Sequence, residues 1–173
     1  MSIIRRGRNR FVALFPKLVI VIKLPRISIT LFKSILNPEK EIIKRYSIKV
    51  FFAGVVGNWR EFLFYQKTHH CFLQPTYFSF LGLINLQRAG KECADSNISH
   101  KIQMAIYPNK TNKERLYCVY VEDVDYLARD MHHWGNSYNF SFWKNKLYIH
   151  DYGSLRTQKV ILKFGETIFK NFS

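Results

Sequence analysis

The sequence predicts an α+β fold, with a small N-terminal antiparallel sheet and one helix followed by a much reduced, mainly helical C-terminal part. Three observations predict it. Runs of β-branched and aromatic residues crowd the first 25 positions, as is typical of strands. Helix-compatible segments then alternate with short β-type runs. The 173 residues, 47% of them apolar, suit one ordinary folded domain.

The first two strands are expected at Phe11–Phe15 and Leu18–Leu24, with a turn near Pro16-Lys17 between them and Pro25 ending the second. The second run contains Val-Ile-Val-Ile, which favours a buried strand. Lysines interrupt this apolar stretch, and it is shorter than the ~20 residues that cross a bilayer. We therefore expect no transmembrane segment.

Two helices are expected next. Pro38 after Asn37 is typical of a first helical turn with its cap. A second helix is expected to start at an Asn58 N-cap, with Glu61 in its third position, and to end near Lys67.

Further strands are expected at Phe72–Pro75, Tyr77–Leu86 and Ile102–Tyr107, with Gly82 marking a bulge or turn and residues 88–100 forming a connection.

The C-terminal part is expected to contain two helices and one strand. Thr111 is a candidate cap for a helix from about Lys113 to Arg129. A polar loop, a strand at Leu147–His150 and a helix from about Leu155 to Phe172 follow.

The net charge indicates which partners the protein favours, and the cysteines indicate its cellular compartment. The formal net charge is +15, and residues 1–50 hold 12 of the 27 Lys/Arg but 2 of the 12 Asp/Glu. Such a field favours polyanions: nucleotides, nucleic acid or an anionic membrane surface. Three widely spaced cysteines without a C-x-x-C pair favour a reducing compartment, so we expect a cytoplasmic protein.

The most informative stretch is Asp130-Met-His-His-Trp-Gly-Asn136, followed by a β-type run and then Asp151-Tyr-Gly153. Phosphoryl transfer to a hydroxyl uses an acceptor-side carboxylate and a metal-binding amide and carboxylate, in this order. With Lys23 on a strand and Glu61 on the next helix, the chain resembles the protein-kinase-like superfamily. The resemblance is to its small atypical branch, the aminoglycoside-phosphotransferase-like and lipopolysaccharide-core kinases. These kinases carry D-x-H-x-x-N loops, and Asp130-Met-His132 is similar to the start of such a loop.

The resemblance runs from about Arg8 to Gly153. It implies one minimal kinase-like domain over residues 1–173, with about 1–87 as an N-lobe and about 88–173 as a reduced C-lobe. It also implies Mg²⁺ and ATP as cofactors.

The resemblance implies a role for each motif residue. Lys23 would grip the α- and β-phosphates, and Glu61 would pair with it. Asp130 would orient the attacking hydroxyl, supported by His132. Asn136 and Asp151 would bind Mg²⁺.

The sequence departs from the family pattern at several points. Asn136 follows Asp130 by six positions rather than five, so either an insertion intervenes or Asn139 is the metal-side amide. The histidine of H-R-D is replaced by Ala128, and no G-x-G-x-x-G occurs, so Gly7 alone stands where the phosphate cover is expected. Only 20 residues follow Gly153, which predicts no full helical lobe.

The expected activity is an ATP/Mg-dependent phosphotransferase acting on an unidentified hydroxyl acceptor, or a weakly active or inactive relative. The alternative is a basic, non-catalytic module for nucleic acid or another polyanion, with interleaved aromatic side chains stacking on bases.

Each motif residue also has an ordinary structural explanation. The charged end of the Lys23 side chain could simply extend to water. Glu61 could be a carboxylate in the first turn of a helix, where the helix dipole favours negative charge. Asp130 could be a solvated charge, and Asp151 could open a turn with Gly153 at positive φ. An ion pair between Lys23 and Glu61 favours the enzyme.

Overall fold

The computed structural model describes residues 3–6, 10–26, 41–122, 130, 134 and 136–172. These fall into two compact units, each described by itself below. The first unit comprises Met1–Gln66 with Pro75–Ala89, and the second comprises Lys67–Gln74 with Gly90–Ser173. The predicted α+β character with a small antiparallel sheet is confirmed. The predicted division near residue 87 lies close to the boundary after Ala89, although residues 67–74 group with the second unit.

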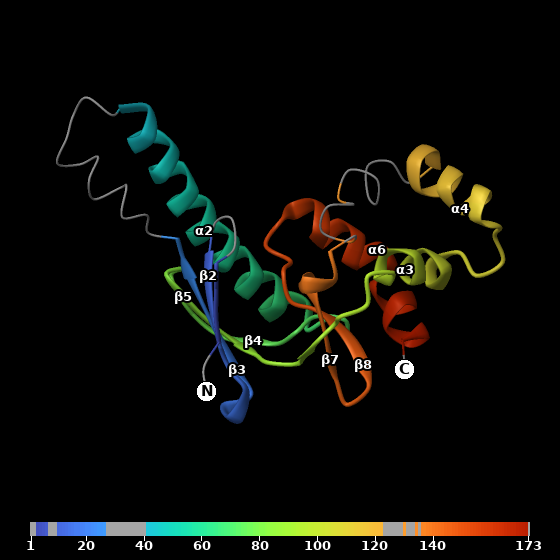
Figure 1. The fold of residues 1–173 in the computed structure, drawn as a ribbon, viewed down its shortest axis with the longest axis horizontal. Helices are drawn as coiled ribbons and strands as arrows, with labels where there is room; N and C mark the ends of the chain where they lie inside the picture. The colour runs from blue at the N-terminus through green and yellow to red at the C-terminus, as the bar shows by residue number, and fades with distance from the viewer. Residues whose placement is uncertain are drawn as a thin grey trace. The chain divides into compact units, whose positions relative to one another are not determined.

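The first unit is built on a five-stranded antiparallel sheet with the order β1-β2-β3-β5-β4 (Figure 1). The strands are β1 (Ile3–Arg6), β2 (Arg10–Phe15), β3 (Ile20–Pro25), β4 (Thr76–Phe80) and β5 (Ile84–Arg88).

The predicted β2–β3 hairpin and its turn at Pro16–Leu18 are confirmed. The predicted Tyr77–Leu86 run is a second hairpin rather than one strand, and Gly82 lies in its turn with φ +75°. Strand β1 was not predicted, because its four residues, two isoleucines followed by two arginines, are too few and do not alternate as a strand pattern does.

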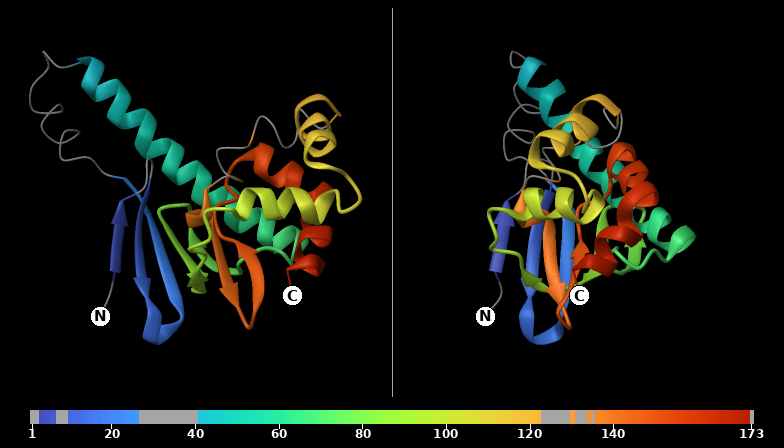
Figure 2. Two further views of the ribbon diagram at one scale, coloured as in Figure 1. Left: turned by 45° about the vertical axis from the view of Figure 1, so that its right-hand side comes forward. Right: turned by 90° about the vertical axis from the view of Figure 1, so that its right-hand side faces the viewer.

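One long helix, α2 (Glu41–Thr68), lies along one face of this sheet (Figure 2). The predicted N-cap at Asn58 is therefore wrong, since Asn58 lies in the interior of the helix. Gly54 and Gly57 lie just before Asn58 and weaken a helix by about 1 kcal/mol each, but packing against the sheet outweighs that cost. The predicted helix start at Asn37-Pro38 lies outside the described residues.

The second unit contains a three-stranded antiparallel sheet of β6 (Lys91–Glu92), β7 (Phe140–Trp143) and β8 (Lys146–Ile149). The last of these confirms the predicted strand at Leu147–His150. The predicted strand at Phe72–Pro75 is wrong, because Leu73 makes only an isolated bridge to Ile149.

The helices of the second unit are α3 (Ile98–Ile106), α4 (Asn112–Tyr117) with a π-helical turn at Cys118–Glu122, and α6 (Leu155–Asn171). The predicted strand at Ile102–Tyr107 is wrong. Buried Ile98, Ile102 and Ala105 recur with helical spacing, and this period is visible only when residues before Ile102 are included.

The predicted cap at Thr111 is confirmed, with a complete capping box to Glu114, as is the terminal helix. The predicted continuation of the Thr111-capped helix to Arg129 passes residue 122 and lies outside the described residues. No helix within the described residues is both long and apolar enough to span a bilayer.

Candidate functional site

Lys23 and Glu61 form a buried ion pair in the first unit. Lys23 Nζ lies 2.7 Å from Glu61 Oε2, and the two side chains are 3% and 0% exposed. The pair joins β3 to α2, as the sequence resemblance requires. Lys23 therefore does not extend to water, and Glu61 lies deep in a helix rather than in its first turn. Both ordinary explanations for these two residues are excluded.

Arg10 adds a second cation to the same carboxylate. Its Nη1 lies 2.5 Å from Glu61 Oε1 and 3.2 Å from Asn58 Oδ1. Two cations, Arg10 and Lys23, therefore share the Glu61 carboxylate.

Asn58 ties the ion pair to the surrounding backbone. The Asn58 Nδ2 donates to the main-chain carbonyl oxygens of Gly82 at 3.0 Å and Lys23 at 3.4 Å. The main-chain carbonyl of Asn58 accepts from Asn85 Nδ2 at 2.6 Å. Helix α2, strand β3 and the β4–β5 turn are thus held together around Glu61. This fixes the Lys23 side chain from both ends.

Arg10 and the true role of Asn58 were missed in the sequence, although signals for both exist. Lys23 pairs with Val12 across the β2–β3 hairpin, and Arg10 lies two residues before Val12, so Arg10 and Lys23 share one face of the sheet. Asn58 precedes Glu61 by three residues, which places both on one helix face. Combining the strand period of two residues with the helix period of about 3.6 residues would have predicted that Arg10, Lys23, Asn58 and Glu61 lie together.

Asp130 is buried in the second unit, with no exposed surface. Its Oδ2 accepts a hydrogen bond of 2.8 Å from Trp134 Nε1. The Trp134 ring stacks on Phe72 and packs against Phe140. Asp130 is therefore not a solvated helix-end charge. Trp134, which the sequence suggested only as part of a loop insertion, is its hydrogen-bond donor.

The β7–β8 hairpin brings the predicted metal-side residues to one end. Phe140 pairs with Ile149, and beyond that pair the His150 N–H donates to the Asn139 carbonyl at 3.0 Å. Asp151 follows directly and is half-buried. Asn136 is exposed, and its Oδ1 accepts the Tyr138 N–H at 3.1 Å. A carbonyl oxygen has a second lone pair, so this bond does not exclude a metal.

The backbone after Asp151 is anchored on both sides. Tyr152 is fully buried, and its hydroxyl donates to the Gln74 carbonyl at 2.8 Å. Ser154 then caps α6 by accepting the Arg156 N–H. Gly153 is not at positive φ, a conformation that among the described glycines is found only at Gly82. The simple turn explanation for Asp151 is therefore excluded.

Of the predicted residues, Lys23 and Glu61 are in contact within the first unit. Asn136, Asp151 and the buried Asp130 belong to the second unit. Gly7, His132 and Ala128 lie outside the described residues. Among the residues that the structure describes, no group of three or more His, Cys, Asp or Glu side chains could hold a metal ion. Magnesium needs fewer protein ligands, because phosphate and water supply the rest.

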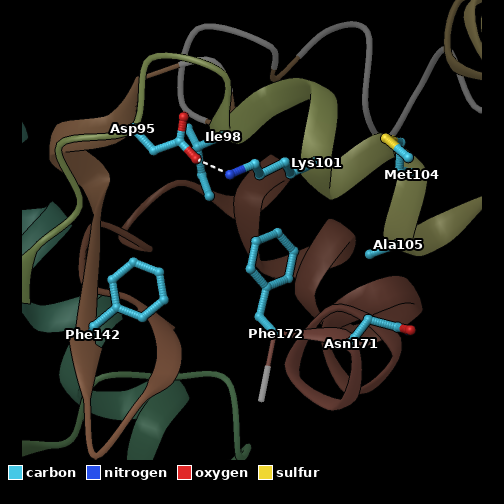
Figure 3. A pocket seen from close by; sticks show the side chains of 8 residues that line it. All are labelled: Asp95, Ile98, Lys101, Met104, Ala105, Phe142, Asn171 and Phe172. Atoms are coloured by element: carbon cyan, nitrogen blue, oxygen red, sulfur yellow. Dashed lines mark hydrogen bonds and ion pairs between the residues drawn. The ribbon is translucent and has the colours of Figure 1, made fainter.

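A hollow of about 420 Å³ in the second unit involves none of these residues (Figure 3). Lys101 Nζ lies 2.6 Å from Asp95 Oδ2 at its edge, and this hydrogen bond lowers the pKa of Asp95 below its ordinary value. The remaining lining is mostly apolar: Ile98, Met104, Ala105, Phe142, Asn171 and Phe172. No convergent polar groups mark it as a binding site.

Comparison with known proteins gives no family: no family model, no curated protein and no solved structure matches this chain.

Proposed function

We propose that this chain is a kinase-like phosphotransferase that binds Mg-ATP and acts on a hydroxyl acceptor, with weak turnover. The observation that carries the proposal is the buried Lys23–Glu61 pair at 2.7 Å. In protein kinases the corresponding lysine lies on the third strand and pairs with a glutamate of the next helix. Lys23 is likewise on the third strand in chain order, and Glu61 is on the helix that follows.

In this proposal Lys23 binds the α- and β-phosphates, and Glu61 holds the ammonium group of Lys23 in position. Arg10 contacts the same carboxylate, and cations held in fixed positions support the binding of an anion because they need no reorganisation when the ligand arrives. Asn58 keeps the group rigid through its bonds to β3 and the β4–β5 turn. The chain's own contribution is therefore preorganised positive charge.

Asn136 and Asp151 are the residues that would hold Mg²⁺, with Asn139 as the alternative amide. Their amide and carboxylate oxygens suit a hard cation, which neutralises phosphate charge when bound. The β7–β8 hairpin supports this assignment. Its register places Asn139 beside His150, and Asp151 is the next residue in the chain.

Asp130 is the proposed acceptor-side carboxylate, and its burial is the reason for expecting weak turnover. A general base must lie within about 3 Å of the hydroxyl that it serves. Asp130 has no exposed surface, and Trp134 occupies Oδ2. Transfer therefore requires this carboxylate to become accessible, whereas nucleotide binding does not.

Thermal unfolding with ATP, with and without Mg²⁺, tests the proposal. A ligand at 100 times its dissociation constant stabilises the folded state by about 2.7 kcal/mol. We expect a magnesium-dependent rise in melting temperature that disappears in Asp151→Asn. The matched control is Asp95→Asn, which removes a carboxylate of the same unit from the hollow around α3 and should leave the rise intact. No rise in the unmodified protein would refute ATP-dependent catalysis.

A further inference from the structure

Helix α2 carries an outward face that the ion pair does not use. Four large apolar side chains on it are exposed: Ile48 by 37%, Phe52 by 58%, Val56 by 41% and Leu63 by 47%. Their spacings of four, four and seven residues place them on one side of the helix. Glu61 and Asn58 lie on the opposite, buried side. The outward face of α2 is therefore apolar without being part of the core.

Basic side chains accompany this apolar stripe. Four of them are exposed along the same side of the helix: Arg45, Lys49, Arg60 and Lys67. Glu61 is the single acidic residue between Arg45 and Lys67, and it is buried against Lys23. Between these two residues the outward face thus has positive charge, apolar side chains and no acidic side chain.

The β4–β5 turn extends the apolar surface. Gly82 lies so close to the Val55 carbonyl and to Trp59 that a side chain there would collide with the helix backbone. The neighbouring Leu81 and Leu83 are 64% and 38% exposed. The turn therefore lies beside α2 and presents two more leucines to solvent.

We propose that the outward face of α2, with the adjoining β4–β5 turn, docks on an anionic membrane surface. A helix face that carries both apolar and basic side chains can lie against the plane of the lipid headgroups, where its apolar side chains enter the acyl boundary and its cations meet anionic headgroups. Nucleic acid fits less well, because Ile48, Val56 and Leu63 have no ring to stack on a base. A second copy fits less well too, because two such basic faces repel.

Sedimentation with lipid vesicles tests the proposal. The full chain is mixed with phosphatidylcholine vesicles, either pure or containing phosphatidylserine, and the bound fraction is measured. We expect binding to the phosphatidylserine vesicles only. Phe52→Gln combined with Leu63→Gln should weaken it about tenfold or more, because the removed apolar area no longer enters the bilayer. The matched control, Leu116→Gln with Leu162→Gln, removes two equally exposed leucines from α4 and α6 and should bind normally.

A second pair of variants tests the charge. Lys49→Gln with Lys67→Gln should weaken binding about thirtyfold, since each basic residue near an anionic surface contributes about fivefold. Lys113→Gln with Lys159→Gln, which lowers the net charge equally on α4 and α6, should cost much less. Urea midpoints equal to that of the parent establish that the exposed substitutions leave the fold intact.

Three outcomes would overturn the proposal. The first is the absence of vesicle binding. The second is binding that all charge variants weaken alike and that Phe52→Gln with Leu63→Gln leaves unchanged, which would mean general attraction between a basic protein and any polyanion, nucleic acid included. The third is a dimer in sedimentation velocity that Phe52→Gln with Leu63→Gln dissociates, which would assign the face to a second copy.

Discussion

The two units hold their buried polar groups in different ways. In the first unit, the Glu61 carboxylate is met by two cations, Lys23 and Arg10. In the second unit, the Asp130 carboxylate accepts from the neutral indole of Trp134, and the half-buried His70 accepts the Phe72 N–H on Nδ1. Charge in the first unit is concentrated and fixed, which suits the binding of an anion. The bonds from Trp134 to Asp130 and from Phe72 to His70 in the second unit have uncharged donors, and they suit packing rather than the binding of an anion.

The largest effect is expected where this charge cluster is broken. Glu61→Gln leaves Lys23 and Arg10 together in a buried place without their carboxylate, and breaking a buried ion pair costs about 3–5 kcal/mol. Urea unfolding of the variant should show this loss of stability. Lys23→Met should cost less, because Arg10 still pairs with Glu61.

The control for this prediction is Glu166→Gln, which breaks an ion pair of 3.7 Å to Lys170 whose side chains are both at least 70% exposed. Exposed pairs of this kind contribute less than about 1 kcal/mol. Equal losses of unfolding free energy for Glu61→Gln and Glu166→Gln would mean that the buried cluster contributes no more to stability than an exposed ion pair.

An intermediate effect is expected at Trp134. Trp134→Phe keeps an aromatic ring beside Phe72 and Phe140 but removes the N–H that Asp130 accepts. Depriving a buried group of its partner costs about 1–3 kcal/mol. Urea unfolding should show a loss in this range. A cost similar to that of Glu61→Gln would contradict the contrast between the two units.

The smallest effect is a dependence on pH through His70. Burial lowers the pKa of His70 below its ordinary value of 6.5, and Glu166 opposes the shift. The unfolded chain then binds more protons than the folded protein as pH falls below about 6.5. Stability should therefore decrease as the solution is acidified through that range, and the Phe72 N–H loses its acceptor.

Urea unfolding between pH 7.5 and 5.5 checks this prediction. In His70→Asn an amide oxygen replaces the ring nitrogen as acceptor and does not titrate, so the dependence on pH should be shallower than in the unmodified protein. His100→Asn, an exposed position on α3, is the control and should leave the dependence unchanged. A steeper or unaltered slope in His70→Asn would show that another group governs the acid sensitivity.

The sequence predicts some regular elements and the central pair, and fails where distant segments decide the outcome. The β2–β3 hairpin and the terminal helix follow from local patterns. The pairing of Lys23 with Glu61 was expected from the order of motifs. Asn58 was misassigned as a cap because Asn58 followed by Glu61 matches a helix start, and the sheet that stabilises the longer helix is remote in sequence. The burial of Asp130 could not be predicted, because its hydrogen-bond donor Trp134 is placed by packing against Phe72 and Phe140.

Labelling of Lys23 by an ATP analogue tests the central claim most directly. An analogue with a reactive acyl group on its terminal phosphate transfers that group to a lysine amine beside the bound phosphates, and mass spectrometry identifies the modified residue. Lys23 is 3% exposed, so reagents that do not bind should miss it. We predict that Lys23 is the main labelled lysine and that excess Mg-ATP protects it. Labelling confined to exposed lysines, unaffected by Mg-ATP, would contradict the proposed nucleotide site.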